Sequence, residues 1–316
     1  MITAGGPTDI RAAWGQIDDP ADPESLLVLG GGTNVIISDE GFAGTVLRVG
    51  GGSVAWTESG DGTTDVAADA GVVWDDLVAT SVARDLTGIE LMSGIPGAVG
   101  ASPIQNIGAY GQQVADVITR VEVLDRRDGR EATIDAADVG FGFRHSRFKA
   151  EWRDRYIVTR VHFRLHAART VPPRPSTYVD IERHFAQSGA DPTDVAARRT
   201  AVVDTRRTKS MLLDPADPDA RSVGSFFVNP TVPTDLAVEL ATRFETLGLR
   251  VHYLEGHGAV APERTRIPAA HLLRASGLHP GDRWGPVGTS TKHVLALVTH
   301  PVATADDVWQ VANAIR

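Results

Sequence analysis

The chain has 316 residues, of which 42% are apolar and 22% charged, and its formal net charge is −9. This length allows two or three domains with real cores, and the composition is ordinary for a folded soluble protein. The acidic balance argues against general nucleic-acid or membrane-surface binding, which requires a basic face. The absence of cysteine excludes disulfides, thiolate nucleophiles and cysteine-ligated metals. No apolar run approaches the roughly 20 residues of a membrane helix. The first residues contain no apolar signal core, so we expect a cytoplasmic protein.

The first half of the chain predicts mainly strands. Short apolar runs broken by glycines, and apolar residues alternating around Asp128-Gly129, are typical of strands and of a hairpin. Apolar residues at helical spacing predict one helix, from about Val73 to a stop before Gly88. The predicted strands are 26–29, 35–37, 46–49, the two arms of a hairpin over 117–134, and 155–166.

The sequence changes in character after about residue 168. Residues 170–178 contain three prolines and form the best candidate for a linker. Beyond them helices and strands are interspersed, and a threonine followed by two acidic residues predicts the start of the last helix at Thr304. The chain therefore predicts an α+β fold with a second domain. Its predicted helices are 194–209, 235–247, 269–275 and 304–316, and its strands are 221–230 and 293–301.

The triple glycine Gly30–Gly32 follows a predicted strand and suggests a phosphate-binding loop. A dinucleotide-binding fingerprint would need glycine at position 35, where the chain has valine, and then a helix. A P-loop would need a Gly-Lys-Ser/Thr sequence to follow. A tight structural turn and an anion-binding loop both remain open. Thr33 and Asn34 slightly favour the second, since a hydroxyl and an amide beside exposed N–H groups suit an anion.

Residues 92–111, MSGIPGAVGASPIQNIGAYG, consist mostly of Gly, Ala, Ser and Pro and carry no charge. Glycine costs backbone entropy, so something must require bare backbone here. A generic buried loop would explain the stretch, and so would a loop that lines a ligand. The second interpretation is favoured, because Gln105, Asn106 and Tyr110 supply polar contacts and the interspersed isoleucines are foreign to a flexible linker.

Three other features have a structural and a functional interpretation. GFGFRHSRFK (140–149) places Arg144 among aromatic residues, which fits a solvated edge strand or an anion site. VVDTRRTKSMLLDP (202–215) places Arg206 and Lys209 at a helix end, where the helix dipole accounts for most of the cations. Ser225 in GSFFVNP does not form a G-x-S-x-G elbow. The ten histidines include no HExxH or HxH pattern, so no metal site is expected.

In this order, six segments resemble the UDP-N-acetylenolpyruvoylglucosamine reductase family of flavoenzymes, commonly called MurB. They are LGGGTNV, GIPGAVGASPIQNIGAYG, FRHSRFK, RRTKSMLLDP, GSFFVNP and GPVGTSTKHVLALV, and they cover residues 27 to about 298. The resemblance implies an α+β protein with a two-part FAD-binding domain of the vanillyl-alcohol-oxidase (PCMH) type at 1–168. Its lobes would be about 1–48 and 49–168, and a substrate-binding domain would follow at 169–316.

The resemblance also implies a reaction. With NADPH as reductant and non-covalent FAD, the enolpyruvyl ether of UDP-N-acetylglucosamine would be reduced to UDP-N-acetylmuramate, a peptidoglycan precursor. Such an oxidoreductase would serve cell-wall biogenesis, cell shape and division. Its partners would be a UDP-sugar and NADPH, without nucleic acid or membrane, and we expect a monomer.

The same resemblance assigns site residues. Arg144 would stabilise the carboxylate as charge builds on it, and Ser225 would donate a proton to C2. Tyr178, in a position typical of the longer subtype, Lys209 and Asn229 would bind substrate. The expected FAD-contacting residues are Gly30, Gly31, Gly32, Thr33, Asn34, Val35, Gly94, Ile95, Pro96, Gly97, Gly100, Ala101, Gln105, Asn106, Gly108, Ala109, Tyr110 and Gly111.

The chain also departs from the family pattern. Phe143 stands where the family usually has tyrosine. The family carries a third catalytic residue, a glutamate in a C-terminal Leu-Glu-Pro-Glu-type strand, but this chain stops at Arg316, and Glu255 is only a superficial match. The resemblance aligns residues 5–7 with the family's first strand, without the lead-in to that strand. The sequence therefore suggests truncation at both ends, or else a natural short form.

These departures keep a second hypothesis open. It is a flavin- or UDP-sugar-binding relative with little or no catalysis, because the glutamate is absent. An oxidase of the wider flavin fold is disfavoured, because GSFF-x-NP and RRTK are typical of the UDP-sugar reductases.

Overall fold

The computed structural model describes residues 1–173, 176, 178–249 and 263–316, so parts of the predicted linker, and Glu255, lie outside the described residues. The chain divides into two compact units. Unit 1 contains Met1–Gly32 and Phe42–Arg207, and unit 2 contains Thr33–Gly41 and Thr208–Arg316. The last division falls after Arg207, and the domain boundary expected after residue 168 stays a prediction.

A small parallel sheet begins unit 1. Leu26 and Leu47 are buried in its core with Ile10 of the covering helix. Two of the three strands predicted between residues 25 and 50 are confirmed. The third, at 35–37, is wrong: Val35, Ile36 and Ile37 form no strand and are each more than 40% exposed. The elements are β1 (Ile2–Ala4), α1 (Pro7–Trp14), β2 (Leu26–Leu29) and β3 (Thr45–Val49), in sheet order β1-β3-β2.

The predicted match of residues 5–7 to a first strand is also wrong. The strand lies before them, at Ile2–Ala4, and Pro7 begins α1. Proline favours the first turn of a helix, because its fixed φ suits the helix and its missing N–H is not needed there.

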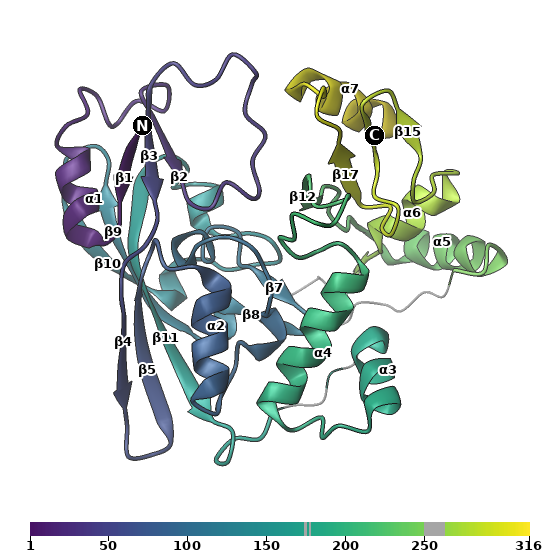
Figure 1. Cartoon of the computed structure of the whole chain (residues 1–316), viewed down its shortest axis with the longest axis horizontal. Helices are drawn as coiled ribbons and strands as arrows, with labels where there is room; N and C mark the ends of the chain where they lie inside the picture. Colours follow the sequence, from purple (N-terminus) through teal and green to yellow (C-terminus); the bar gives the residue numbers. More distant parts are fainter. Residues whose placement is uncertain (174–175, 177, 250–262) are drawn as a thin grey trace. The chain divides into compact units, whose positions relative to one another are not determined.

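A larger antiparallel sheet forms the centre of unit 1 (Figure 1). The hairpin predicted around Asp128-Gly129 is confirmed. Residues of the longest strand alternate in burial, and Phe163 packs edge-to-face on Trp74 at the start of the predicted helix, 6.1 Å between ring centroids. The sheet contains β10 (Glu131–Asp135), β9 (Ile118–Asp125), β11 (Tyr156–Ala167), β5 (Thr63–Asp69) and β4 (Val54–Glu58), with β6 (Leu86–Thr87) on the end of β11 and helix α2 (Trp74–Ala83) following β5.

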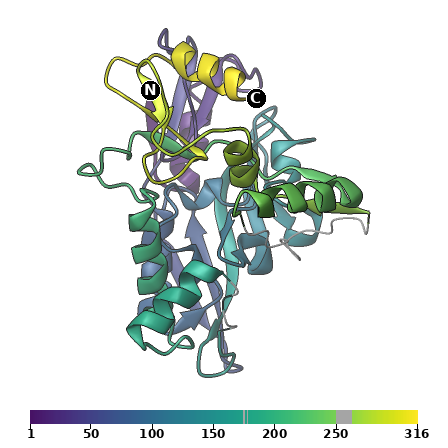
Figure 2. The ribbon, with the colours of Figure 1, turned by 90° about the vertical axis from the view of Figure 1, so that its right-hand side faces the viewer.

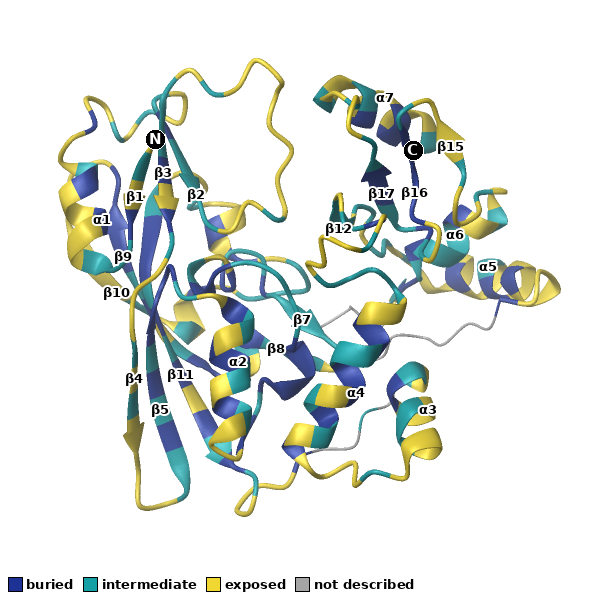
Figure 3. Cartoon of the chain, viewed as in Figure 1, coloured by how far each residue is buried: buried dark blue, intermediate teal, exposed yellow. Residues whose placement is uncertain are grey.

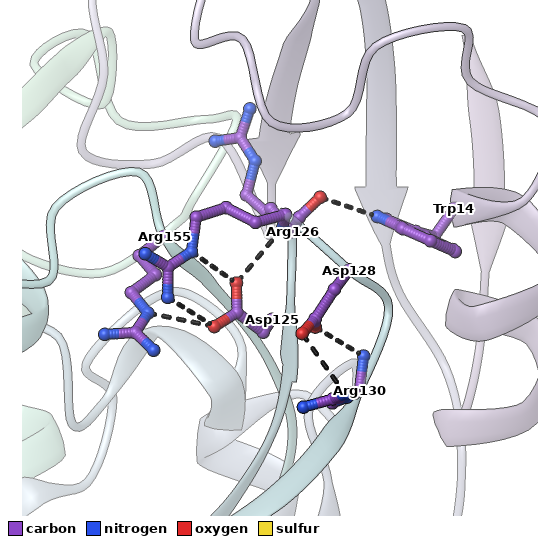
Figure 4. A network of polar contacts seen from close by, with 7 residues as sticks. Trp14, Asp125, Arg126, Asp128, Arg130 and Arg155 are labelled. Atoms are coloured by element: carbon purple, nitrogen blue, oxygen red, sulfur yellow. Dashed lines mark hydrogen bonds and ion pairs between the residues drawn. The ribbon is translucent and has the colours of Figure 1, made fainter.

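Asp125, at the end of β9, is the centre of an ionic network (Figure 4). Its carboxylate accepts hydrogen bonds from Arg127 at 3.0 Å and from Arg155 at 2.9 Å. Next to it, the carbonyl of Arg126 accepts from the indole of Trp14 in α1 at 3.1 Å. Burial alone would raise the pKa of Asp125, but the bonds from Arg127 and Arg155 outweigh it and lower that pKa to about 2.

We expect Asp125→Asn to destabilise the protein by up to about 2 kcal/mol at neutral pH. Because the folded pKa is depressed, this stabilisation is present above the unfolded pKa, near 4. It is lost as pH falls through the folded pKa of about 2. Urea unfolding of wild type and variant between pH 7 and pH 2 should therefore converge at the acid end. Asp128→Asn, at a 47% exposed carboxylate, is the matched control and should change stability little. A gap of constant size down to pH 2 would contradict the prediction.

Two helices complete unit 1, α3 (Val179–Ser188) and α4 (Val195–Thr208), and the helix predicted at 194–209 is thereby confirmed. They lie side by side in both views (Figures 1 and 2). Ile181 of α3 packs on Ala201 and Val202 of α4 and on Leu91. Arg198, also in α4, forms a fully buried ion pair with Glu90, with 2.9 Å between Nε and Oε1.

A four-stranded antiparallel sheet in unit 2 is covered by the last helix of the chain. Val308, Val311 and Ala312 of the helix pack on Val287 and Leu297 of the sheet. The predicted start at Thr304 is confirmed, since Thr304 and Asp307 form a capping box. All the helices and strands predicted after residue 208 are present. They belong to the set β12 (Ser222–Ser225), β17 (Ala296–Thr299), β16 (Val287–Thr289), β15 (Arg283–Trp284), α7 (Ala305–Ile315), α5 (Thr234–Thr246), α6 (Ala269–Ala275), β13 (Thr231–Pro233) and β14 (Arg264–Arg266).

The segment Thr33–Gly41 packs as part of unit 2 although it interrupts unit 1 in sequence. It is almost entirely exposed (Figure 3). Asp39 accepts a hydrogen bond from the backbone N–H of Ala305 at the first turn of α7, at 2.7 Å. This carboxylate therefore supplies one of the acceptors that a helix N-terminus needs.

Candidate functional site

The glycine-rich stretch is a loop fastened to the chain that leads into α2. The N–H of Trp74 donates to Gly97 O at 3.0 Å. In the other direction, Val99 donates to Val72 O and Gly100 to Ala70 O, both at 2.8 Å. The loop continues through a single turn of 3₁₀ helix (Val99–Ala101) into the short hairpin β7 (Gly108–Ala109) and β8 (Gln112–Gln113).

Two of the glycines are required by the chain itself. Gly97 has a φ of +125°, a conformation that is essentially restricted to glycine. A Cβ on Gly100 would lie 2.6 Å from the Cβ of Ala70, closer than side chains approach. Backbone geometry and close packing therefore explain part of the glycine content, and the need for space beside a ligand is not the only cause.

The Gly30–Gly32 turn lies against this loop. A Cβ built on Gly30 is 3.5 Å from Ala98 Cβ, in ordinary contact, while Gly31 and Gly32 are exposed. Ser102, in the same loop, is 1% exposed, and its hydroxyl has no hydrogen-bond partner among the described residues. A buried hydroxyl without a partner is costly unless a ligand completes it. The two neighbouring glycine loops and this hydroxyl fit a bound dinucleotide cofactor.

The other predicted members of the first glycine loop belong to unit 2. Thr33 is half-buried, and Asn34 and Val35 are exposed, at the start of the segment that packs with α7. Of the predicted cofactor residues 30–35, the three glycines therefore belong to unit 1 and the other three residues to unit 2.

Arg144 is brought to the glycine-rich loop of unit 1. It lies in a turn closed by reciprocal bonds between Gly142 and His145, with its own φ at +52°. Its guanidinium donates from Nη1 to Asn106 O at 3.3 Å and from Nη2 to Gly108 O at 2.6 Å. Arg144 is also stacked over the ring of Phe143, 5.4 Å to the centroid. A fixed cation thus lies beside the loop predicted to bind the cofactor.

Tyr178 of unit 1 packs on the loop through Tyr110. Their rings meet edge-to-face with centroids 5.6 Å apart. Arg206 of α4 hydrogen-bonds the side chain of Tyr110 and donates from Nε to Gly94 O at 3.2 Å. Burial lowers the pKa of Arg206 and raises that of Tyr110. Arg206 therefore connects both ends of the glycine-rich loop.

Sequence reasoning missed this role of Arg206, since it credited the helix dipole for the cations there. The signal was present in the helix: Val202 and Arg206 are four residues apart and share the buried face of α4. Asp75 was also missed. It pairs with Arg199 at 2.6 Å and accepts from the N–H of Gly94, also at 2.6 Å. Burial would raise the pKa of Asp75, but these hydrogen bonds lower it overall.

The other predicted site residues lie in unit 2. Ser225 is exposed at the end of β12 and follows Gly224, which has a φ of +74°. Asn229 accepts from the N–H of Ala269 at 2.9 Å and so caps α6. Lys209 lies near His293, whose pKa is lowered first by burial and then by the charge of Lys209.

Two kinds of feature are absent from the described residues. In the part of the chain that the structure describes, no three His, Asp or Glu side chains are grouped as metal ligands. Within those same ranges, no helix is long and apolar enough to cross a membrane.

Family models match two parts of the chain. An FAD binding domain matches residues 3–135, and the C-terminal domain of UDP-N-acetylenolpyruvoylglucosamine reductase matches residues 215–316. The first match supports FAD as the cofactor of the two glycine loops. Together with the mixed helices and strands, the matches confirm the predicted α+β class with an FAD-binding domain of the PCMH type.

Several relatives are similar over almost the whole chain. The UDP-N-acetylenolpyruvoylglucosamine reductase of Thermobifida fusca is 44% identical, over 98% of this chain and 85% of the relative. That of Streptomyces avermitilis is 41% identical over 100% and 84%. The crystal structure of the Thermus caldophilus enzyme (MurB) shares the fold, with a TM-score of 0.62 at 22% identity, covering 99% of this chain and 86% of that one. The chain therefore belongs to the UDP-N-acetylenolpyruvoylglucosamine reductase family.

Proposed function

We propose that this protein reduces UDP-N-acetylglucosamine-enolpyruvate to UDP-N-acetylmuramate, with NADPH as reductant and FAD as cofactor. The observation that carries the proposal is the fixed position of the Arg144 guanidinium. Its guanidinium is fixed by the carbonyls of Asn106 and Gly108, in the loop assigned to the cofactor. Relatives named for this reaction at 38–44% identity support the same substrate.

The residues that would hold FAD are the two glycine loops, Gly30–Val35 and 94–111, with Ser102 as a buried hydroxyl that needs a partner. Binding is non-covalent, because the chain has no cysteine and neither loop contains histidine. When bound, FAD supplies the two-electron transfer between NADPH and the enolpyruvyl group.

The chain's own residues handle charge and protons. Arg144 stabilises the negative charge that develops on the substrate carboxylate, the electrostatic effect that usually contributes most to catalysis. Ser225 holds the proton destined for C2 and must be shielded from water for that transfer. Tyr178, Lys209 and Asn229 bind the UDP-sugar. Lys209 supplies a positive charge for the diphosphate.

The biological setting follows from that product. The protein serves peptidoglycan precursor synthesis and thereby cell-wall biogenesis, cell shape and cell division. It works in the cytoplasm as a monomer, with small molecules as its only partners. The alternative, a flavin- or UDP-sugar-binding relative without catalysis, is favoured by no observation of the fold or of the relatives.

The proposal is tested on purified chain 1–316 that has been checked for bound yellow flavin. NADPH oxidation is followed with and without UDP-N-acetylglucosamine-enolpyruvate, and the product is identified by mass spectrometry. Substrate-dependent NADPH oxidation with formation of UDP-N-acetylmuramate supports the proposal. Bound flavin that NADPH reduces, and that the substrate leaves reduced, supports the non-catalytic alternative. Rapid oxygen consumption without substrate would indicate an oxidase.

A further inference from the structure

Asn106 ties the glycine-rich loop to the turn that carries Arg144. Its side chain is buried, with the residue 2% exposed. Nδ2 donates to Gly142 O at 2.9 Å and to Gln113 Oε1 at 3.0 Å, and Oδ1 accepts from Ala115 N at 3.1 Å. Both N–H groups of the amide therefore donate to acceptors within the protein.

The backbone of the same residue holds the guanidinium. Asn106 O accepts from Nη1 of Arg144 at 3.3 Å, while its Nδ2 bonds Gly142 O, two residues before Arg144. Gly142 O also accepts from His145 N at 3.2 Å, the bond that closes the turn. One residue thus fixes both the start of the turn and the head group that the turn presents.

The turn needs such support. Arg144 has a φ of +52°, in the left-handed region that a non-glycine residue adopts only where the surroundings hold it. Asn106 has a φ of +49°, and asparagine tolerates this region better than most residues. A further hydrogen bond also joins the two segments, but the turn side donates it, from Ser146 Oγ to Ile104 O at 2.6 Å.

We propose that Asn106 is a positioning residue for Arg144. Its side chain sets the place of the guanidinium through Gly142 and the turn, and neither of its N–H groups is left over for the FAD contact that the resemblance implies. This inference rests on the proposed function, because it takes Arg144 as the group that meets the substrate carboxylate.

Asn106→Asp is the test variant, since it keeps the size and the acceptor but replaces two donors by a carboxylate facing Gly142 O. Flavin absorbance in anaerobic stopped flow separates reduction by NADPH from reoxidation by UDP-N-acetylglucosamine-enolpyruvate. We expect flavin content and the reduction rate to stay within twofold of wild type. Reoxidation should slow between about tenfold and a hundredfold, the usual effect of a small misplacement of a reacting group.

A double-mutant cycle identifies the route of the effect. In an Arg144→Ala background, Asn106→Asp should change reoxidation less than twofold, because the residue through which it acts is gone. Gln112→Glu is the matched control, because it also turns an amide into a carboxylate. The bond that Gln112 accepts from Leu91 N at 2.7 Å needs only the oxygen, which the glutamate keeps. Equal slowing of both half-reactions, loss of flavin, or full additivity with Arg144→Ala would overturn the inference.

A readout without turnover separates this inference from the proposed function. Amide hydrogen exchange of residues 142–146 should speed up about tenfold in Asn106→Asp and stay unchanged in Gln112→Glu. If wild type is inactive, the proposed function fails, and this exchange still decides whether Asn106 holds the turn. Asn106→Gly, which keeps the backbone conformation, gives the same expectations should the aspartate variant not fold.

Discussion

Ser225→Ala is expected to slow reoxidation of the flavin by UDP-N-acetylglucosamine-enolpyruvate between about a hundredfold and ten-thousandfold, the usual contribution of a positioned proton donor. Reduction of the flavin by NADPH should remain within twofold of wild type, because that step needs no proton at C2. Both rates are measured by anaerobic stopped flow on protein with equal flavin content.

Ser276→Ala is the matched control for that variant. Both serines are exposed residues of unit 2, but the hydroxyl of Ser276 donates to Leu272 O within α6 at 3.0 Å. The control should leave both half-reactions unchanged. An equal loss of both half-reactions in Ser225→Ala, or no loss in either, would refute the assignment of Ser225 as proton donor.

Arg198→Met is expected to cost about 3–5 kcal/mol of folding stability, the typical effect of leaving one partner of a buried ion pair alone. The side chains of Arg198 and Glu90 are 1% and 0% exposed. Glu90 also accepts a hydrogen bond from Gly88 N at 2.8 Å, which holds its carboxylate in this buried position. Urea unfolding of flavin-free protein, followed by circular dichroism, measures the loss.

Two companion variants locate the cause of that loss. Glu90→Gln combined with Arg198→Met removes both charges and should recover more than half of the lost stability. Arg183→Ala breaks the exposed pair with Asp180 in α3, where the arginine is 58% exposed, and should cost less than about 0.5 kcal/mol. A double variant as unstable as Arg198→Met alone would show that lost packing, not the unpaired charge, is responsible.

Local patterns predicted most of the regular structure. The hairpin around Asp128-Gly129 and the capped helix at Thr304 were predictable because a turn dipeptide and a capping residue act within a few positions. Residues 35–37 failed because a strand also needs a neighbouring strand to pair with, and sequence alternation does not say whether one exists. The packing of α3 and α4 on the rest of unit 1 could not be predicted in this way. It depends on contacts such as Arg198–Glu90, between residues that lie far apart in sequence.

The candidate site was predictable to a similar degree. The resemblance pointed to Arg144 and to the loop it contacts, and the structure brings these two together. It gave no indication that Asn106 bonds Gly142, because nothing in the amide side chain distinguishes a ligand contact from a structural one. Arg206 was misjudged for the opposite reason: a local explanation, the helix dipole, was sufficient and concealed its bond to Gly94.

The discontinuity of unit 2 limits how this protein can be recombined with its relatives. The chain leaves unit 1 after Gly32, returns at Phe42 and leaves again after Arg207. A chimera joined only at Arg207 would pair the 33–41 segment of one parent with the α7 of another. The Asp39–Ala305 bond would then depend on two independent sequences. Exchange of unit 2 between homologues therefore requires three crossover points, after Gly32, Gly41 and Arg207, so that both pieces of unit 2 come from the same parent.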